Sequence, residues 1–219
     1  HNGLIAACYL ARAGREVIVL EQAASAGGGS RTAATIAGLP DYRFDLHSVA
    51  HNILNMTSIP SELALAEAGL DYLEMNPFSV AIRADGVHLR FFRSIEATIE
   101  AMRAVSHADA DAYAAFMRVA EPLVRAVLPT IRGEAHAAER AGQFSAAARL
   151  LRRQGLMTLA HDLLGPYDAL LKRRLASDLT RGPVAAFAAH ANVGPSTPGG
   201  AFYAFWQAAY HLFGQWHAR

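Results

Sequence analysis

The first 21 residues carry the pattern that most limits how this chain can fold. A small, apolar segment, Ile5–Ala13, follows Gly3, and Gly14 separates it from the apolar run Glu16–Leu20 and from Glu21. This spacing predicts a helix that ends at Gly14, followed by a buried strand with an acidic residue at its tip. A helix and strand in this order form the second half of a βαβ dinucleotide-binding unit. We expect the first strand and the earlier glycines to lie upstream, so that the chain is an internal piece of a longer protein.

Three residues of this pattern are candidates for cofactor contact. Gly3 would let the helix pack closely on the sheet, with the helix N-terminus towards a pyrophosphate. Glu21 lies 18 residues later, where a carboxylate can accept hydrogen bonds from both ribose hydroxyls and repel a 2′-phosphate. Gln22 follows it and is included with it. A solvated glutamate at a strand end is the alternative interpretation.

A second glycine-rich loop, Gly27-Gly28-Gly29, precedes Ser30, Arg31 and Thr32. Consecutive glycines allow positive φ angles and let backbone N–H groups approach an anion. The two hydroxyls add donors, and the guanidinium adds a fixed positive charge. A flexible surface loop is the alternative, but the spacing from Glu21 favours an anion site.

Glu21, Gly27-Gly28 and Arg31-Thr32 together resemble the E-x5-G-G-x-x-[RS]-[ST] signature of flavin-dependent amine oxidases and phytoene desaturases. The opening His1–Leu4 is similar to the end of the G-A-G-H-N-G-L loop of the phytoene-desaturase-like branch. That branch includes proteins like the pyridine nucleotide-disulfide oxidoreductase domain-containing protein 2. Ser196–Gly199 and the aromatic segment after it also resemble this branch.

The resemblance implies FAD as the cofactor. It places the ribose on Glu21 and the dinucleotide along Gly27, Gly28, Ser30, Arg31 and Thr32. It also implies that Phe44–Ser48 crosses beneath the isoalloxazine ring, which makes His47 and Ser48 candidate flavin contacts. Many members have glycine where His47 stands, so a displaced or absent flavin is the alternative. For His51, nearby, a hydrogen-bonded structural histidine is the expected state.

The fold class we expect is α/β. Residues 1–59 are predicted to form a partial FAD-binding, Rossmann-like domain of the two-dinucleotide-binding type, without its first strand. Residues 60–219 are predicted to form part of a mostly helical α+β substrate domain. The Asp85-Gly86 pair predicts a hairpin near residues 78–92. The helices expected after it are Ser94–Val105, Ala108–Leu128, Phe144–Leu164, Tyr167–Leu175 and Gly200–Phe213.

The function implied by the resemblance is an FAD-dependent oxidoreductase. Such an enzyme would transfer hydride to flavin from an apolar small molecule, such as an isoprenoid or lipid-like substrate. The alternatives are an amine oxidase-like flavoenzyme, an NAD-dependent dehydrogenase and a non-catalytic remnant that acts as a binding module. No residue can be assigned as a catalytic acid or base, and the ten histidines show no spacing typical of a metal site.

Charge and hydropathy limit the partners. A net charge of +1 gives no reason to expect nucleic acid, and no run of about 18 apolar residues is present. The single cysteine suits a reducing compartment, so we expect a cytoplasmic protein. The basic runs Arg152-Arg153 and Lys172–Arg174 are expected on solvated helix faces, with peripheral membrane contact as the alternative. The aromatic residues of segment 202–213 are expected to pack in a core or to line an apolar tunnel.

Overall fold

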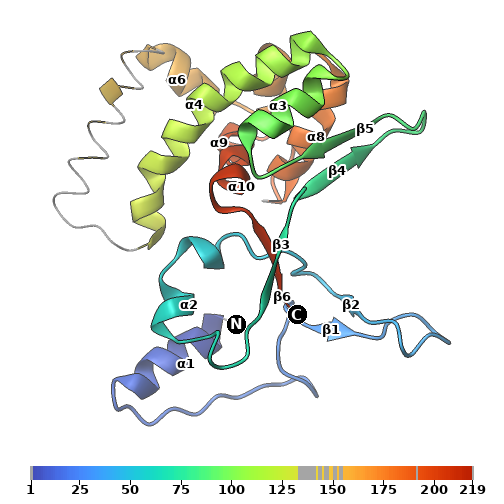
Figure 1. The fold of residues 1–219 in the computed structure, drawn as a ribbon. Helices are drawn as coiled ribbons and strands as arrows, with labels where there is room; N and C mark the ends of the chain where they lie inside the picture. The colour runs from blue at the N-terminus through green and yellow to red at the C-terminus, as the bar shows by residue number, and fades with distance from the viewer. Residues whose placement is uncertain are drawn as a thin grey trace. The chain divides into compact units, whose positions relative to one another are not determined.

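The computed structural model describes residues 2–132, 155–190 and 192–218, together with positions 142, 145, 148, 149 and 152. The chain divides into two compact units. The N-terminal unit comprises His1–His51, Ile59–Leu73 and Trp216–Arg219, and the helical unit comprises Asn52–Ser58 and Glu74–Gln215. Figure 1 shows the order of the elements along the chain.

Helix α1 (Asn2–Arg12) opens the N-terminal unit and confirms the first predicted helix. It ends at Arg12, just before Gly14, whose φ of +75° lies in the left-handed region that glycine adopts without steric cost. The Gly14 amide bonds to the Ala11 carbonyl at 2.9 Å, and the Arg15 amide bonds to the Leu10 carbonyl at 3.0 Å. These two bonds satisfy carbonyls that have no hydrogen-bond donor within the helix.

The strand predicted at Glu16–Leu20 is wrong for the described part of the chain, where Arg15–Gln22 has no regular secondary structure. Ile18 and Leu20 are 80% and 90% exposed. A parallel strand is held by hydrogen bonds to a neighbouring strand, and no described strand lies beside this segment. The described residues therefore do not form the parallel sheet expected of the dinucleotide-binding unit.

Short paired strands and short helices follow along the chain. Strand β1 (Thr32–Ala33) is antiparallel to β2 (Phe44–Asp45), with Thr32 opposite Asp45. Helix α2 (Ile59–Glu62) follows the short 3-10 helix η1 (Leu54–Met56), which belongs to the helical unit. Strands β3 (Tyr72–Met75) and β6 (Gln215–Ala218) pair with each other, and neither was predicted.

The hairpin expected near residues 78–92 is confirmed in the helical unit. Strands β4 (Ser79–Ile82) and β5 (His88–Phe91) are antiparallel, with Ala81 opposite Leu89. Gly86 has a φ of +84° in the connecting turn. Leu89 and Phe91 are buried on the inner face, whereas Val80 and Ile82 on the other face are exposed.

Seven described helices complete the helical unit. Five of the predicted segments are helical at least in part: α3 (Ile95–Arg103), α4 (His107–Arg132), α6 (Leu156–Leu164), α7 (Tyr167–Arg174), and the pair α9 (Ala201–Phe205) and α10 (Gln207–Phe213). Most of the expected helix before Leu156 lies outside the described residues. The remaining helix, α8 (Asp178–Ala189), was not predicted, because Gly182-Pro183 is typical of a helix break. Within the described ranges, no helix is long and apolar enough to cross a membrane.

Aromatic side chains of α9 and α10 pack in the core, as the first of the two interpretations of segment 202–213 predicts. Phe205 is fully buried and stacks on Phe116 of α4, with ring centroids 5.3 Å apart. Tyr210 is 8% exposed and lies 4.8 Å from the ring of Phe187. Tyr203 is 38% exposed and stands at the edge of this cluster.

Asp109 is buried and joins α4 to the start of α8. Its carboxylate accepts hydrogen bonds from the Ser177 amide at 2.9 Å, from the Ser177 hydroxyl and from the Thr180 hydroxyl at 3.0 Å. Burial raises the pKa of Asp109, but the bonds from Ser177, Thr180 and Ser106 outweigh burial and hold the pKa below its usual value. The carboxylate is therefore charged in the folded protein and holds Ser177, whose hydroxyl caps α8 by accepting from the Leu179 amide.

A second buried polar group, His211 on α10, binds α4 and the turn before α3. Nδ1 of His211 lies 2.9 Å from the Phe92 carbonyl, which can only accept, so Nδ1 carries the proton. Nε2 then accepts from the Tyr113 hydroxyl at 2.6 Å, and that hydroxyl accepts from Gln207 at 3.1 Å. Burial lowers the pKa of His211 from 6.5 to about 4, although the carbonyls of Arg93 and Phe92 act in the opposite direction.

The neutral state of His211 makes the stability of the helical unit depend on pH. Below pH 6.5 the unfolded chain binds a proton at His211 that the folded chain binds only near pH 4. The contribution of neutral His211 to the free energy of unfolding is fully present above pH 6.5. It falls by up to roughly 3 kcal/mol as pH drops to 4. We predict that the stability difference between the wild type and His211→Gln, measured by urea unfolding, shrinks over this range. The exposed-site variant His88→Gln should follow the wild-type profile, and a parallel profile for His211→Gln would contradict the assignment.

Candidate functional site

The second glycine loop lies against the segment that follows β2. The Leu46 amide bonds to the Arg31 carbonyl at 3.0 Å, and the Ser48 amide bonds to the Gly29 carbonyl at 3.2 Å. Residues up to 19 positions apart in sequence therefore meet at this ribbon of β1 and β2. The structure brings together seven of the predicted cofactor residues: Gly27, Gly28, Ser30, Arg31, Thr32, His47 and Ser48.

Two glycines of the loop have backbone conformations that other residues rarely adopt. Gly27 has a φ of +118° and Gly28 a φ of +55°. A Cβ atom at Gly27 would lie 3.2 Å from the Ser30 carbonyl oxygen, and the Ser30 amide bonds to the Gly27 carbonyl at 2.9 Å. At Gly29, a Cβ atom would touch Cβ of His47 at 3.6 Å. The loop therefore forms a tight turn that packs on the predicted flavin-crossing segment.

Polar side chains on this ribbon suit an anionic ligand. Nη1 of Arg31 donates to the Ser25 hydroxyl at 2.9 Å, while its buried Nε has no hydrogen-bond partner among the described residues. A buried guanidinium N–H without a partner costs free energy, and a phosphate or carboxylate oxygen would satisfy it. The hydroxyl of Thr32 donates to Asp45 at 2.6 Å, so in this arrangement it links β1 to β2.

The other three predicted cofactor residues are separate from this cluster. Gly3 lies in α1, and no described atom lies within 4 Å of the position its Cβ would take, so the close helix–sheet packing expected there is not observed. Glu21 is exposed and accepts a hydrogen bond from the nearby Ala23 amide at 2.8 Å. Gln22 is also exposed. The hydrogen bond of Glu21 is thus to a residue only two positions away. The glycine loop and the segment after β2, by contrast, bond to each other although they are far apart in sequence.

Sequence reasoning missed three residues that bind the segment after β2. The His51 amide donates to the Trp216 carbonyl at 2.7 Å, and Nδ1 of His51 lies 2.8 Å from the Tyr72 hydroxyl. Nδ1 of His217 lies 3.1 Å from the Val49 carbonyl. These partners come from β3 and β6, too far along the chain for any local pattern to connect them with a glycine motif.

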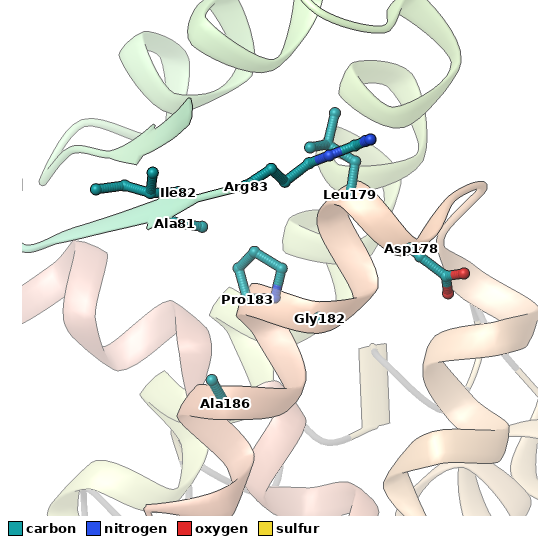
Figure 2. Close-up of a pocket in the computed structure, with 8 residues that line it drawn as sticks. All are labelled: Ala81, Ile82, Arg83, Asp178, Leu179, Gly182, Pro183 and Ala186. Atoms are coloured by element: carbon teal, nitrogen blue, oxygen red, sulfur yellow. The ribbon is translucent and has the colours of Figure 1, made fainter. Parts of the chain in front are cut away.

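The helical unit holds a separate cleft between β4 and α8 (Figure 2), with a volume of about 650 Å³. A smaller hollow of about 220 Å³ shares Ala81, Pro183 and Ala186 with it. The lining is mostly apolar, and its charged groups are Arg83, which pairs with Asp85 at 2.7 Å, and Asp178, which pairs with Arg181 at 3.0 Å. None of the predicted cofactor residues lines this cleft.

The basic run Lys172–Arg174 makes ion pairs, and Lys172 and Arg173 are exposed, as expected of a solvated helix face. Arg173 and Arg174 both bind Asp162, whose side chain is only 4% exposed, and the Arg173 contact measures 2.9 Å. Lys172 pairs with Asp168 at 3.5 Å and is 67% exposed. Arg152 is exposed, and Arg153 lies outside the described residues.

Comparison with known proteins agrees with a dinucleotide site in the N-terminal part of the chain. Residues 1–58 match the family model of the NAD(P)-binding Rossmann-like domain. Over 113 residues the chain is 29% identical to a limonene dehydrogenase subunit from Castellaniella defragrans, a stretch that covers 52% of this chain and 20% of that relative. No solved structure matches the chain. The chain thus carries an oxidoreductase-type, Rossmann-like dinucleotide-binding region and is distantly similar to one subunit of a dehydrogenase.

The glycine loop provides a direct test of its own geometry. Gly27→Ala should lower the free energy of unfolding of the N-terminal unit by roughly 1–2 kcal/mol, because alanine at a φ of +118° is strained and its Cβ crowds the Ser30 carbonyl. Gly3→Ala is the matched control, since its site is open and alanine favours a helix. Thermal unfolding followed by circular dichroism measures both. Equal melting temperatures for Gly27→Ala and the wild type would refute this account of the loop.

Proposed function

We propose that this chain is part of an FAD-dependent oxidoreductase that removes hydride from an apolar small molecule. The observation that carries the proposal is the loop Gly27–Arg31, bonded to the segment that contains His47 and Ser48. The buried Nε of Arg31 has no hydrogen-bond partner in the described part of the chain. Such a loop offers backbone N–H groups and a fixed positive charge to a pyrophosphate.

FAD is favoured over a nicotinamide dinucleotide by the second loop. A simple NAD fold binds its pyrophosphate at the first glycine loop and has no need of a second glycine pair after the acidic residue. The matched family is described as NAD(P)-binding, so an NAD-dependent dehydrogenase is the rival enzyme. Gly3, Glu21 and Gln22 are proposed to contribute the adenosine end of the site.

An apolar substrate is supported by the relative, whose name refers to limonene, a hydrocarbon. When bound, the flavin would accept two electrons and a proton as hydride from a substrate carbon. This chain's residues would bind and orient the cofactor, and none is assigned as an acid or base. Residues 60–219 would form part of the substrate domain. The alternatives are an amine oxidase-like activity and a non-catalytic binding module. The protein is proposed to be cytoplasmic, with peripheral membrane contact as the alternative.

Removing the guanidinium tests the proposed pyrophosphate site. Arg31→Met keeps the aliphatic stem but loses every N–H donor, so we expect FAD affinity to fall about tenfold or more, as for the loss of one charge-assisted hydrogen bond. The matched control is Arg43→Met, an exposed arginine on the loop before β2. Quenching of flavin fluorescence on titration with protein gives both affinities.

Two results would count against the proposal. Equal FAD affinity for Arg31→Met and the wild type would remove Arg31 from the site. Binding of NADH with higher affinity than FAD would instead favour the nicotinamide-dependent dehydrogenase.

A further inference from the structure

We infer that Tyr72, Trp216 and His217 position the segment Asp45–His51 and thereby complete the cofactor site from outside the glycine motif. The inference rests on the proposed function, because it assigns these residues a role in FAD binding. All three lie in the N-terminal unit together with the segment.

His217 connects this segment to the glycine loop through Asp45. Its Nδ1 faces the Val49 carbonyl at 3.1 Å, and a carbonyl can only accept, so Nδ1 carries a proton. The same Nδ1 lies 3.4 Å from a carboxylate oxygen of Asp45, whose other oxygen accepts from the Thr32 hydroxyl at 2.6 Å. A continuous polar path therefore runs from Thr32, beside Arg31, to His217 on β6.

The other end of the segment is held through both its backbone and a side chain. The His51 amide bonds to the Trp216 carbonyl, and the His51 ring bonds to the Tyr72 hydroxyl. The rings of His51 and Tyr72 meet edge to face with centroids 5.6 Å apart, and Tyr72 in turn contacts the Trp216 ring at 6.4 Å. His51 is thus structural, as the sequence predicts, and its partners come from β3 and β6.

The residues between these anchors are fixed against the glycine loop. His47 packs on Gly29 and the Ser48 amide bonds to the Gly29 carbonyl, so the middle of the segment is bound to the loop. Its first residue, Asp45, contacts Thr32 and His217, and its last, His51, bonds to β3 and β6. A segment fixed before the ligand arrives loses little conformational entropy on binding. Loosening the anchors should therefore weaken FAD binding although Arg31 and the loop glycines are unchanged.

The test uses substitutions at His217 and Tyr72 in the full chain. His217→Leu removes the donor, and we expect FAD affinity to fall about fivefold, as for one lost hydrogen bond. His217→Asn places an amide N–H near the position of Nδ1 and should restore affinity to within about twofold of the wild type. Tyr72→Phe removes only the hydroxyl and should weaken binding, whereas the exposed Tyr42→Phe, with Tyr42 61% exposed, should not.

Amide hydrogen exchange at Ser48 and His51 supplies a readout that needs no cofactor. We expect both amides to exchange faster in His217→Leu and at wild-type rates in His217→Asn. Unchanged exchange and unchanged affinity in His217→Leu and Tyr72→Phe would overturn the inference. A wild-type chain that binds no FAD would overturn the proposed function, and the exchange rates would still decide whether these residues anchor the segment.

Discussion

The hydrogen bonds between the loop Gly27–Arg31 and the segment Leu46–Ser48 are the interaction on which the N-terminal unit depends. They convert a glycine-rich sequence, which by itself would be flexible, into a turn with defined N–H directions and a partly buried guanidinium. The positive φ angles of Gly27 and Gly28 make this turn possible. The same bonds fix the segment that contains His47, so the loop and the proposed flavin-crossing segment form one structural element.

The helical unit is organised differently, around buried polar groups on α4. Asp109 binds Ser177, the N-cap residue of α8, and Tyr113 joins α4 to α10 through His211. Apolar packing such as that of Phe205 on Phe116 supplies most of the stabilisation, because dispersion and desolvation scale with buried area. The polar contacts fix which helix faces meet, since each buried group would be costly without its particular partner.

Features determined by nearby residues were predictable from the sequence. The hairpin follows from Asp85-Gly86, the end of α1 from Gly14, and the tight loop from its run of glycines. Features that need distant partners were not predictable. Glu16–Leu20 has the composition of a buried strand, but a strand forms only where a neighbour pairs with it. Tyr72 and His217 lie on β3 and β6, which are far apart in sequence and pair only in the folded chain. Helix α8 was not predicted because Gly182-Pro183 is typical of a helix break. The sequence could indicate the cofactor loop but not the residues that hold the segment beside it.

The measurement that tests the central claim most directly is identification of the bound dinucleotide. The 219-residue chain would be incubated with equimolar FAD, NAD and NADP, freed of unbound ligand and heated, and the released compound identified by mass spectrometry. The account predicts FAD, and a lower yield from Arg31→Met than from Arg43→Met. Release of a nicotinamide dinucleotide, or of no dinucleotide at all, would contradict it.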